Sequence, residues 1–234
     1  MSAADKADKR ELTVSEAVNT RRSVRAFLGK PIDLVVLKEI LALAARAPSG
    51  GNLQPWRVAV LSGGPLEEFR AAMRHRLAER PERDPPQYQV YPDNLAEPYR
   101  TYRFRIGEHM YACLGLPRED KAARRRWFAR NYELFGAPVG LFLFVDKHMG
   151  IAQWTDLGIY LQTLMLLLRA RGLDSCPQEA WSAYHAEVSR FLGADPDWIL
   201  YSGLAIGYAD EAAPVNNFRS ERMPIEDHVR FIGD

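Results

Sequence analysis

Apolar residues recur along this chain with the period of an α-helix in most segments and with the shorter period of a β-strand in a few. The helical spacing predicts helices at 15–20, 34–47, 65–77, 99–114, 118–135, 156–171 and 183–192. Mostly apolar runs predict strands at 56–61, 138–146 and 198–208. Because helices dominate and the strands are interleaved with them, the pattern predicts an α+β domain with a sheet of about four or five strands.

One predicted helix, at 156–171, is apolar nearly all round and ends at Gly172. A helix of that kind has to be covered on every side. In a chain of this size, we expect part of the cover to come from a second copy of the protein. Burial within its own chain is the competing explanation.

Three segments lack a regular apolar pattern and are expected to lie outside the core. Residues 1–12 are charged and are expected to form a flexible tail in front of a single domain at 13–234. Residues 81–98 form a proline-rich loop, the start of a segment at 81–115 that we expect to be a lid, with a tolerated insertion as the alternative. Residues 212–234 are too polar for the core and are expected to form an arm that lies on another surface.

The composition excludes several classes of function. The 234 residues carry a formal net charge of +1, which provides no general attraction to nucleic acid or to an anionic membrane. The longest apolar stretch, 157–168, is too short to cross a bilayer, and the amino-terminal residues lack the apolar core of a secretory signal. The two cysteines and five histidines show neither a disulfide framework nor a metal-binding spacing. We therefore expect a cytoplasmic protein without a metal.

The first stretch with candidate chemistry is the basic segment RRSVR. If this segment is extended, its side chains alternate between faces, so Arg21, Ser23 and Arg25 line one side. Arg22 and Val24 then point to the other side. Two guanidinium groups and a hydroxyl in a row suit an anion, because the planar fork of arginine matches phosphate oxygens. The alternative is a solvated basic strand whose arginines pair with nearby carboxylates.

The second stretch is the turn APSGGNLQPW between the helix at 34–47 and the strand at 56–61. Pro48 ends the helix, and the two glycines that follow allow positive φ angles and the close approach of a ligand. The amides of Asn52 and Gln54 donate and accept hydrogen bonds, as a flat heterocycle edged with carbonyl and N–H groups requires. The alternative is an ordinary polar turn from helix to strand.

Two further polar stretches complete the pattern. Residues 173–181 are predicted to form a turn, in which 177–181 offer backbone N–H groups and a carboxylate. Arg219 and Arg222 lie in the arm at the end of the chain. A ligand with a flat polar ring system at one end and a phosphate at the other would use all four stretches.

In their order along nearly the whole chain, these motifs resemble those of the FMN-dependent nitroreductase family. The matching stretches are RRSVR, APSGGNLQPW, Pro177-Gln178-Glu179, and Gly207-Tyr208 with Arg219. The first two motifs are specific when they occur together. The downstream stretch from WTDLGIYLQTLML to GLDSCPQEAW is similar to the branch of the family that contains nitrobenzoate-type reductases.

The resemblance implies a nitroreductase-like fold, in which helices flank a central mixed sheet and two chains form an intertwined homodimer. It implies that FMN lies between the chains, with its phosphate near Arg21 and its pyrimidine edge near Arg25. Asn52, backed by Gln54, would meet the ring edge, and residues 177–179 would bring a backbone N–H towards the flavin N5. The full set of cofactor-binding residues that it implies is Arg21, Arg22, Ser23, Arg25, Pro48, Ser49, Gly50, Asn52, Gln54, Pro177, Gln178, Glu179, Gly207 and Arg219.

By the same resemblance, we expect an oxidoreductase that takes hydride from NADH or NADPH and reduces a small nitroaromatic or quinone-type acceptor. The flavin carries the hydride, so no catalytic side chain is required, and Arg25 is expected to stabilise the anionic reduced flavin. One shared site for both substrates predicts ping-pong kinetics. Two alternatives remain open: another reaction of the same fold, such as reductive dehalogenation or flavin fragmentation, and a non-redox binding protein for an anionic ligand.

Overall fold

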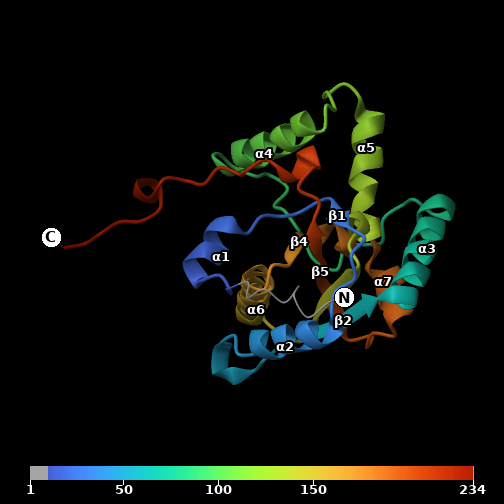
Figure 1. The fold of residues 1–234 in the computed structure, drawn as a ribbon, viewed down its shortest axis with the longest axis horizontal. Coiled ribbons are helices and arrows are strands. Elements are labelled where there is room, and N and C mark those ends of the chain that lie inside the picture. The colour runs from blue at the N-terminus through green and yellow to red at the C-terminus, as the bar shows by residue number, and fades with distance from the viewer. Residues whose placement is uncertain (1–9, 234) are drawn as a thin grey trace.

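The chain folds into one sheet with helices packed on both faces, as a computed structural model of residues 10–233 shows (Figure 1). The first nine residues of the predicted flexible tail lie outside the described residues. The tail's last residue, Leu12, is tied to the body, since its N–H donates to the carbonyl of Ala170.

The sheet has five strands within residues 10–233, and β5 is its central strand. The strands are β1 (Phe27–Leu28), β2 (Arg57–Ser62), β3 (Val139–Asp146), β4 (Asp174–Gln178) and β5 (Trp198–Ala209). One edge of β5 pairs with β3, which pairs in turn with β2, while β4 and β1 share the other edge of β5. All of these pairs are antiparallel, and a parallel bridge joins Ser23 to Ser175.

Within residues 10–233, the helices agree with the predicted periodicity in number and place, although the ends of α5 and α6 differ from the prediction by several residues. They are α1 (Val14–Thr20), α2 (Leu34–Ala44), α3 (Gly63–Glu79), α4 (Tyr99–Cys113), α5 (Lys121–Ala129), α6 (Ile151–Ala170) and α7 (His185–Leu192). Local chemistry fixes two of the starts. Thr13 forms a capping box with Glu16 at α1, and Asp33 accepts a hydrogen bond from the Val35 N–H at α2.

Alternating side chains of β3 build two cores, one on each face of the sheet. Leu141, Leu143 and Val145 face a core with α2 and α6, whereas Phe142 and Phe144 face a core with α3 and α7. Every residue of β3 from Val139 to Val145 is buried, as the apolar run predicts for a central strand.

The predicted turn at 173–181 is wrong in its first half, because residues 174–178 form the strand β4. The sequence DSCPQ looks like a turn because proline and small polar residues are poor strand formers. Pairing with residues 203–207 of β5 overrides that preference. Pro177 is tolerated because β4 has a neighbouring strand on one side only at that position, where a missing N–H leaves no ladder bond unmade.

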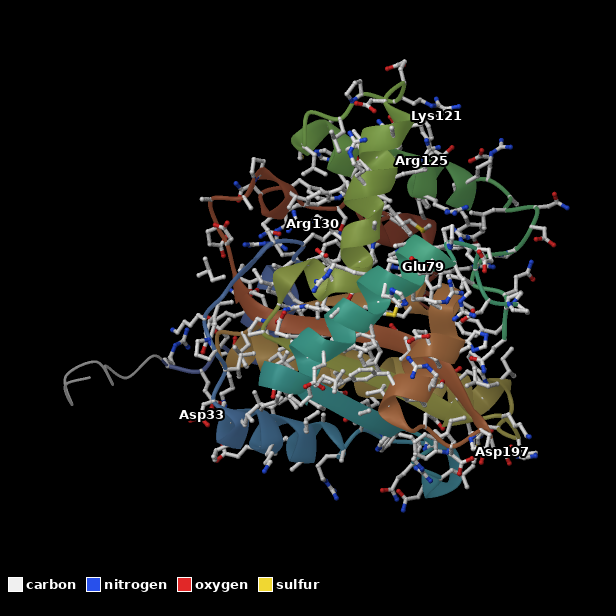
Figure 2. All side chains as sticks on the ribbon, turned by 90° about the vertical axis from the view of Figure 1, so that its right-hand side faces the viewer. Asp33, Glu79, Lys121, Arg125, Arg130 and Asp197 are labelled. Carbon is white, nitrogen blue, oxygen red and sulfur yellow. The ribbon has the colours of Figure 1, made fainter. Side chains whose placement is uncertain are left out.

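The predicted helix at 118–135 is also shorter than its pattern suggests. Regular α-helix ends at Ala129 and continues as 3₁₀ turns, in which Leu134 and Phe135 adopt left-handed φ angles of 54° and 53°. Both side chains are buried, so tertiary packing holds a backbone conformation that their own preferences disfavour. The basic run at 124–126 lies on α5, whose labelled Lys121 and Arg125 project at the surface (Figure 2). Arg125 and Arg126 are exposed, whereas Arg124 is partly buried and pairs with the carboxylate of Glu108.

The proline-rich loop at 81–98 is attached to the sheet at an irregularity in β5. The register between β3 and β5 slips by one residue, which leaves Tyr201 without a partner in β3. The loop supplies the missing hydrogen bonds: the Tyr88 hydroxyl donates to the Tyr201 carbonyl at 2.5 Å, and the Gln87 side chain accepts from the Leu200 N–H at 3.2 Å.

The apolar helix α6 is covered mainly by its own chain, through α1, α2 and the sheet. Ile159 (37% exposed) and Leu166 are less well covered and lie on one remaining face. The arm first passes the body, where Phe218 packs on His109 and Arg219 donates to the carbonyl of Asn19. Its end then extends away (Figure 1) and exposes Phe231 and Ile232 at 80% and 89%. None of the helices formed by residues 10–233 has the length and apolar character needed to cross a membrane.

Candidate functional site

A cavity of about 350 Å³ lies where the end of α1, the segment after it and the C-terminal arm meet. Its lining includes Arg21, Ser23 and Arg25, the three side chains predicted to share a face. The predicted alternation holds for Val24, which is buried and whose N–H donates to the carbonyl of Ser175 at 3.0 Å. It does not hold for Arg22, which lines the same cavity. We call this cavity the basic seat.

Arg219 and Arg222, both from the arm, line the basic seat with Arg21. The pKa of Arg21 is held below its ordinary value, first because the guanidinium is partly buried and then because the positive charges of Arg222 and Arg219 lie close by. Within residues 10–233, none of these three groups has a carboxylate within ion-pair distance. The seat therefore holds uncompensated positive charge, which a bound phosphate would stabilise.

Arg22 behaves differently from its neighbours. It also lines the seat, but its guanidinium pairs with the carboxylate of Glu211. The alternative of a basic strand with carboxylate partners is thus correct for Arg22 and not for Arg21.

A second cavity of about 640 Å³ adjoins the basic seat, and Arg25 lines both. Pro177, Gln178 and Glu179 form one side of it, as predicted for a ligand site. Aromatic side chains form much of the rest, namely Tyr91, Trp127, Phe128 and Tyr132. We call it the aromatic cavity. A basic seat that opens beside an aromatic cavity suits a ligand with a phosphate at one end and a flat ring at the other.

Hydrogen bonds behind the aromatic cavity hold the end of β4 in place. The side-chain amide of Gln178 donates to the backbone carbonyl of Asn131 at 2.8 Å, and its oxygen accepts from the indole N–H of Trp181 at 3.3 Å. The Gln178 side chain is therefore engaged in the structure, which leaves the backbone of residues 177–179 to meet a ligand. Burial raises the pKa of the Glu179 carboxyl, although more than a third of that residue is exposed.

The amide turn at 47–56 lines neither the basic seat nor the aromatic cavity. Its conformation is well defined, because the Gly50 N–H donates to the carboxylate of Asp156 and the Ser49 hydroxyl accepts from the Gln54 N–H at 3.0 Å. Asn52 and Gln54 have positive φ angles of 57° and 49° and are exposed. The Gln54 amide donates to the Asn52 carbonyl at 3.2 Å, so Gln54 does lie behind Asn52.

The helix α6 shows how far the amide turn lies from the basic seat, the two parts of the predicted ligand site. The turn contacts α6 at Asp156, whereas Arg169 near the other end bonds the hydroxyl of Thr20, next to Arg21. Thirteen residues separate these two positions, which is about 20 Å at ~1.5 Å per residue. A single chain therefore does not bring Asn52 and Gln54 to the basic seat.

Gly207 is explained by packing instead of by ligand contact. It lies inside β5, and a Cβ there would approach Pro138 Cδ to 2.7 Å and Phe27 Cδ1 to 2.8 Å. Gly207 lines neither the basic seat nor the aromatic cavity. Its predicted contact with the cofactor therefore remains a prediction.

Cys176 packs in the core beside β5 and is 1% exposed. Burial raises the pKa of its thiol, with Arg25 and Arg21 acting weakly in the opposite direction. We expect the native protein to react with a thiol reagent at pH 8 through the partly exposed Cys113 alone. A Cys113→Ser variant should then react only when unfolded, and fast labelling of that folded variant would contradict the burial of Cys176.

Three arginines that line these cavities, Arg83, Arg103 and Arg222, were not predicted from the sequence as site residues. Arg222 was placed in the arm but not in the site, although it follows Arg219 by three residues. Arg83 and Arg103 line the aromatic cavity, and each lies in a segment where charged residues are common. Arg222 could have been predicted, because it lies three positions after Arg219, a predicted phosphate-binding residue. For the other two, no local pattern distinguishes them from solvated arginines.

Comparison with known proteins places this architecture in a family. The Nitroreductase family model matches residues 18–208. The chain is 38% identical to a 4-nitrobenzoate reductase of Pseudomonas putida, over 92% of this chain and 94% of that protein. It is 34% identical to a nitrobenzene nitroreductase of Ectopseudomonas oleovorans, over 94% and 96%.

A solved structure has the same fold. That of the FMN and NADPH-dependent nitroreductase NfnB from Sphigopyxis sp. strain HMH is 47% identical and superimposes with a TM-score of 0.91, over 95% of this chain and 100% of that one. The nitroreductase-like fold and the nitrobenzoate-reductase branch, both predicted from the motifs, are confirmed. The chain belongs to the Nitroreductase family.

Proposed function

We propose that this protein is an FMN-dependent nitroreductase that takes electrons from NADH or NADPH and passes them to a small nitroaromatic or quinone-type acceptor. One observation carries the proposal: arginines without carboxylate partners line the basic seat, and Arg25 lines both this seat and the aromatic cavity. The names of similar proteins, which include nitrobenzene and 4-nitrobenzoate reductases and an FMN and NADPH-dependent nitroreductase, support it.

The residues present fit FMN on the chemistry of their donors. Arg21, Ser23 and Arg219 would hold the phosphate, with Arg222 as a fourth donor. The hydroxyl of Ser175, which is buried and has no hydrogen-bond partner among the described residues, lies beside Ser23 in the parallel bridge. An orphaned buried hydroxyl is unfavourable by about 1–3 kcal/mol, and a polar ligand at the seat is the kind of partner it requires.

Bound FMN would supply hydride transfer, and the chain's own residues would bind and orient it. Residues 177–179 would offer a backbone N–H to the ring, on a strand end that Gln178 and Trp181 hold rigid. Arg25, between the two cavities, would stabilise negative charge on the ring, because a fixed cation acts strongly in a partly desolvated site.

We further propose that two copies of the chain share each site. The amide turn, with Pro48, Ser49, Gly50, Asn52 and Gln54, would come from one copy and the basic seat from the other, because about 20 Å of α6 separates them within one chain. The less covered face of α6 and the apolar side chains of the extended arm favour a second copy as their cover.

The overall reaction balances with one dinucleotide for each two-electron step. A nitro group, one NAD(P)H and one proton yield a nitroso group, oxidised dinucleotide and water. No side chain of the protein gains or loses electrons, so the cavity residues have only to bind the two substrates in turn. The oxidised dinucleotide therefore leaves before the acceptor enters.

The test uses the purified full-length protein. We expect a yellow dimer in sedimentation that releases FMN on denaturation, oxidises NADH or NADPH anaerobically in the presence of 4-nitrobenzoate or a quinone, and gives parallel lines in double-reciprocal plots. Intersecting lines would rule out the single shared site. A colourless protein that takes up no added FMN would overturn the proposed function and favour a non-redox anion-binding protein. Deiodination, or loss of free reduced FMN, in place of nitro reduction would favour another flavin reaction.

A further inference from the structure

Two arginines outside the proposed flavin contacts face the aromatic cavity. Arg83, from the loop at 81–98, and Arg103, from α4, both line it. Across residues 10–233, neither has a carboxylate within ion-pair distance. Arg103 lies instead over the ring of Tyr91, with 4.1 Å between the guanidinium carbon and the ring centroid. Unpaired cations on a partly enclosed wall favour a ligand that carries negative charge.

A buried clamp fixes the backbone on both sides of Arg83. Arg76 of α3, which is 6% exposed, donates to the carbonyl of Glu82 at 3.0 Å and to the carboxylate of Asp84 at 3.1 Å. The second oxygen of Asp84 accepts from the backbone N–H of Ala186, in the first turn of α7, at 2.9 Å. Because both neighbours of Arg83 are held, its position on the cavity wall is set by the folded core and not by a free loop.

The rest of the aromatic cavity is suited to a flat ring. Trp127, Phe128 and Tyr132 contribute ring surfaces to its wall. Burial raises the pKa of the Tyr132 hydroxyl, and the nearby positive charge of Arg83 acts in the opposite direction. Arg83 and Tyr132 thus line the same cavity, with the guanidinium near the Tyr132 hydroxyl. Rings and unpaired cations on one wall are complementary to an aromatic anion.

We propose that Arg83 and Arg103 recognise an anionic oxygen group on a ring-bearing ligand of the aromatic cavity, with Asp84 as a positioning residue for Arg83. The inference rests on the proposed function, in which two ligands carry such a group. One is an acceptor with a carboxylate on its ring, and the other is NADPH with its ribose phosphate. Both enter the same place in turn, so one pair of cations is available to each.

The experiment measures kcat/KM for matched substrates in the FMN-loaded protein. The variants are Arg83→Ala, Arg83→Gln, Arg103→Ala and Asp84→Asn. The control is Arg80→Ala, which removes an exposed arginine three residues before Arg83 that does not line the cavity. One arm compares 4-nitrobenzoate with nitrobenzene at fixed NADPH. The other compares NADPH with NADH at fixed nitrobenzene.

We expect the Arg83 and Arg103 variants to lower one of these two ratios by about 10-fold or more, the range for a lost charge-assisted hydrogen bond. A fall in the first ratio assigns the anion to the acceptor, and a fall in the second assigns it to NADPH. Asp84→Asn should lower the same ratio by less, because it loosens the position of Arg83 without removing the guanidinium. The ratio is the informative quantity, because general damage to the fold would lower both of its members together.

Two results separate failure of the inference from failure of the proposed function. If the variants retain FMN and both ratios stay within 2-fold of those for Arg80→Ala, Arg83 and Arg103 do not recognise an anion and the inference is overturned. If the unaltered protein binds no FMN and reduces neither acceptor, the proposed function fails, and the inference fails with it.

Discussion

Replacing Arg21 with alanine is expected to weaken FMN binding by about 1.5–3 kcal/mol, or roughly 10- to 150-fold in Kd. Arg21 is the member of the basic seat whose pKa is lowered by burial and by the charges of Arg222 and Arg219. Within residues 10–233 it has no carboxylate partner, so its charge is free to meet a phosphate. The measurement is a fluorescence titration of the apoprotein with FMN.

The same substitution is expected to leave the apoprotein as stable as before, or slightly more stable. The charged form of Arg21 is disfavoured in the folded state, which is what a lowered pKa means for a base. Removing the charge therefore removes a repulsion within the seat. Weaker FMN binding together with unchanged or higher resistance to urea marks a ligand-binding cation, whereas a purely structural arginine would lower both.

The control for Arg21→Ala is Arg80→Ala, which removes the same charge from the exposed end of α3. An FMN affinity within 2-fold of the unaltered protein is expected for this variant. If Arg21→Ala has the affinity of the control, the phosphate does not lie in the basic seat, and the assignment of Ser23 and Arg219 to it is wrong as well.

The basic seat was predictable from the sequence because its key feature is local. In an extended segment the side chains alternate, so the order Arg21, Ser23, Arg25 already implied one shared face. The buried Val24 on the other face provides the anchor. Helices were predictable for the same reason, since the residues that share a helix face are near one another in the sequence.

Features that depend on distant residues were harder to predict. The strand β4 exists because residues 174–178 pair with 203–207, about thirty positions later in the chain, and its own sequence favours a turn. Arg83 lines the aromatic cavity because Arg76, Asp84 and α7 hold the loop, and none of these contacts follows a short sequence period. The turn at 47–56 was predicted as a turn, but its distance from the basic seat within one chain follows from the length of α6, which no local motif encodes.

Gly203→Ala is expected to destabilise the protein by about 3 kcal/mol, at the upper end of the range for overpacked cores. Gly203 lies in β5 between Phe142 of β3 and Gln178 of β4, so its backbone is paired on both sides. A Cβ at this position would lie 2.7 Å from Nε1 and 3.1 Å from Cγ of Trp181. The indole is fully buried and packs against the rings of Phe69, Phe142 and Tyr132. Neither the indole nor the backbone of Gly203 therefore has room to move.

The same substitution is expected to weaken FMN binding, although Gly203 lines neither cavity. The indole N–H of Trp181 bonds the Gln178 side chain, which in turn holds the end of β4 against Asn131. Displacing the indole disturbs that support and with it the backbone of residues 177–179. The urea midpoint and the FMN titration should therefore both change.

The control is Gly107→Ala, inside α4, where no neighbouring group lies within 4 Å of the added Cβ. The better helix propensity of alanine should stabilise this variant by about 0.5–1 kcal/mol. Equal stability of the two variants would show that the Trp181 contact yields without strain.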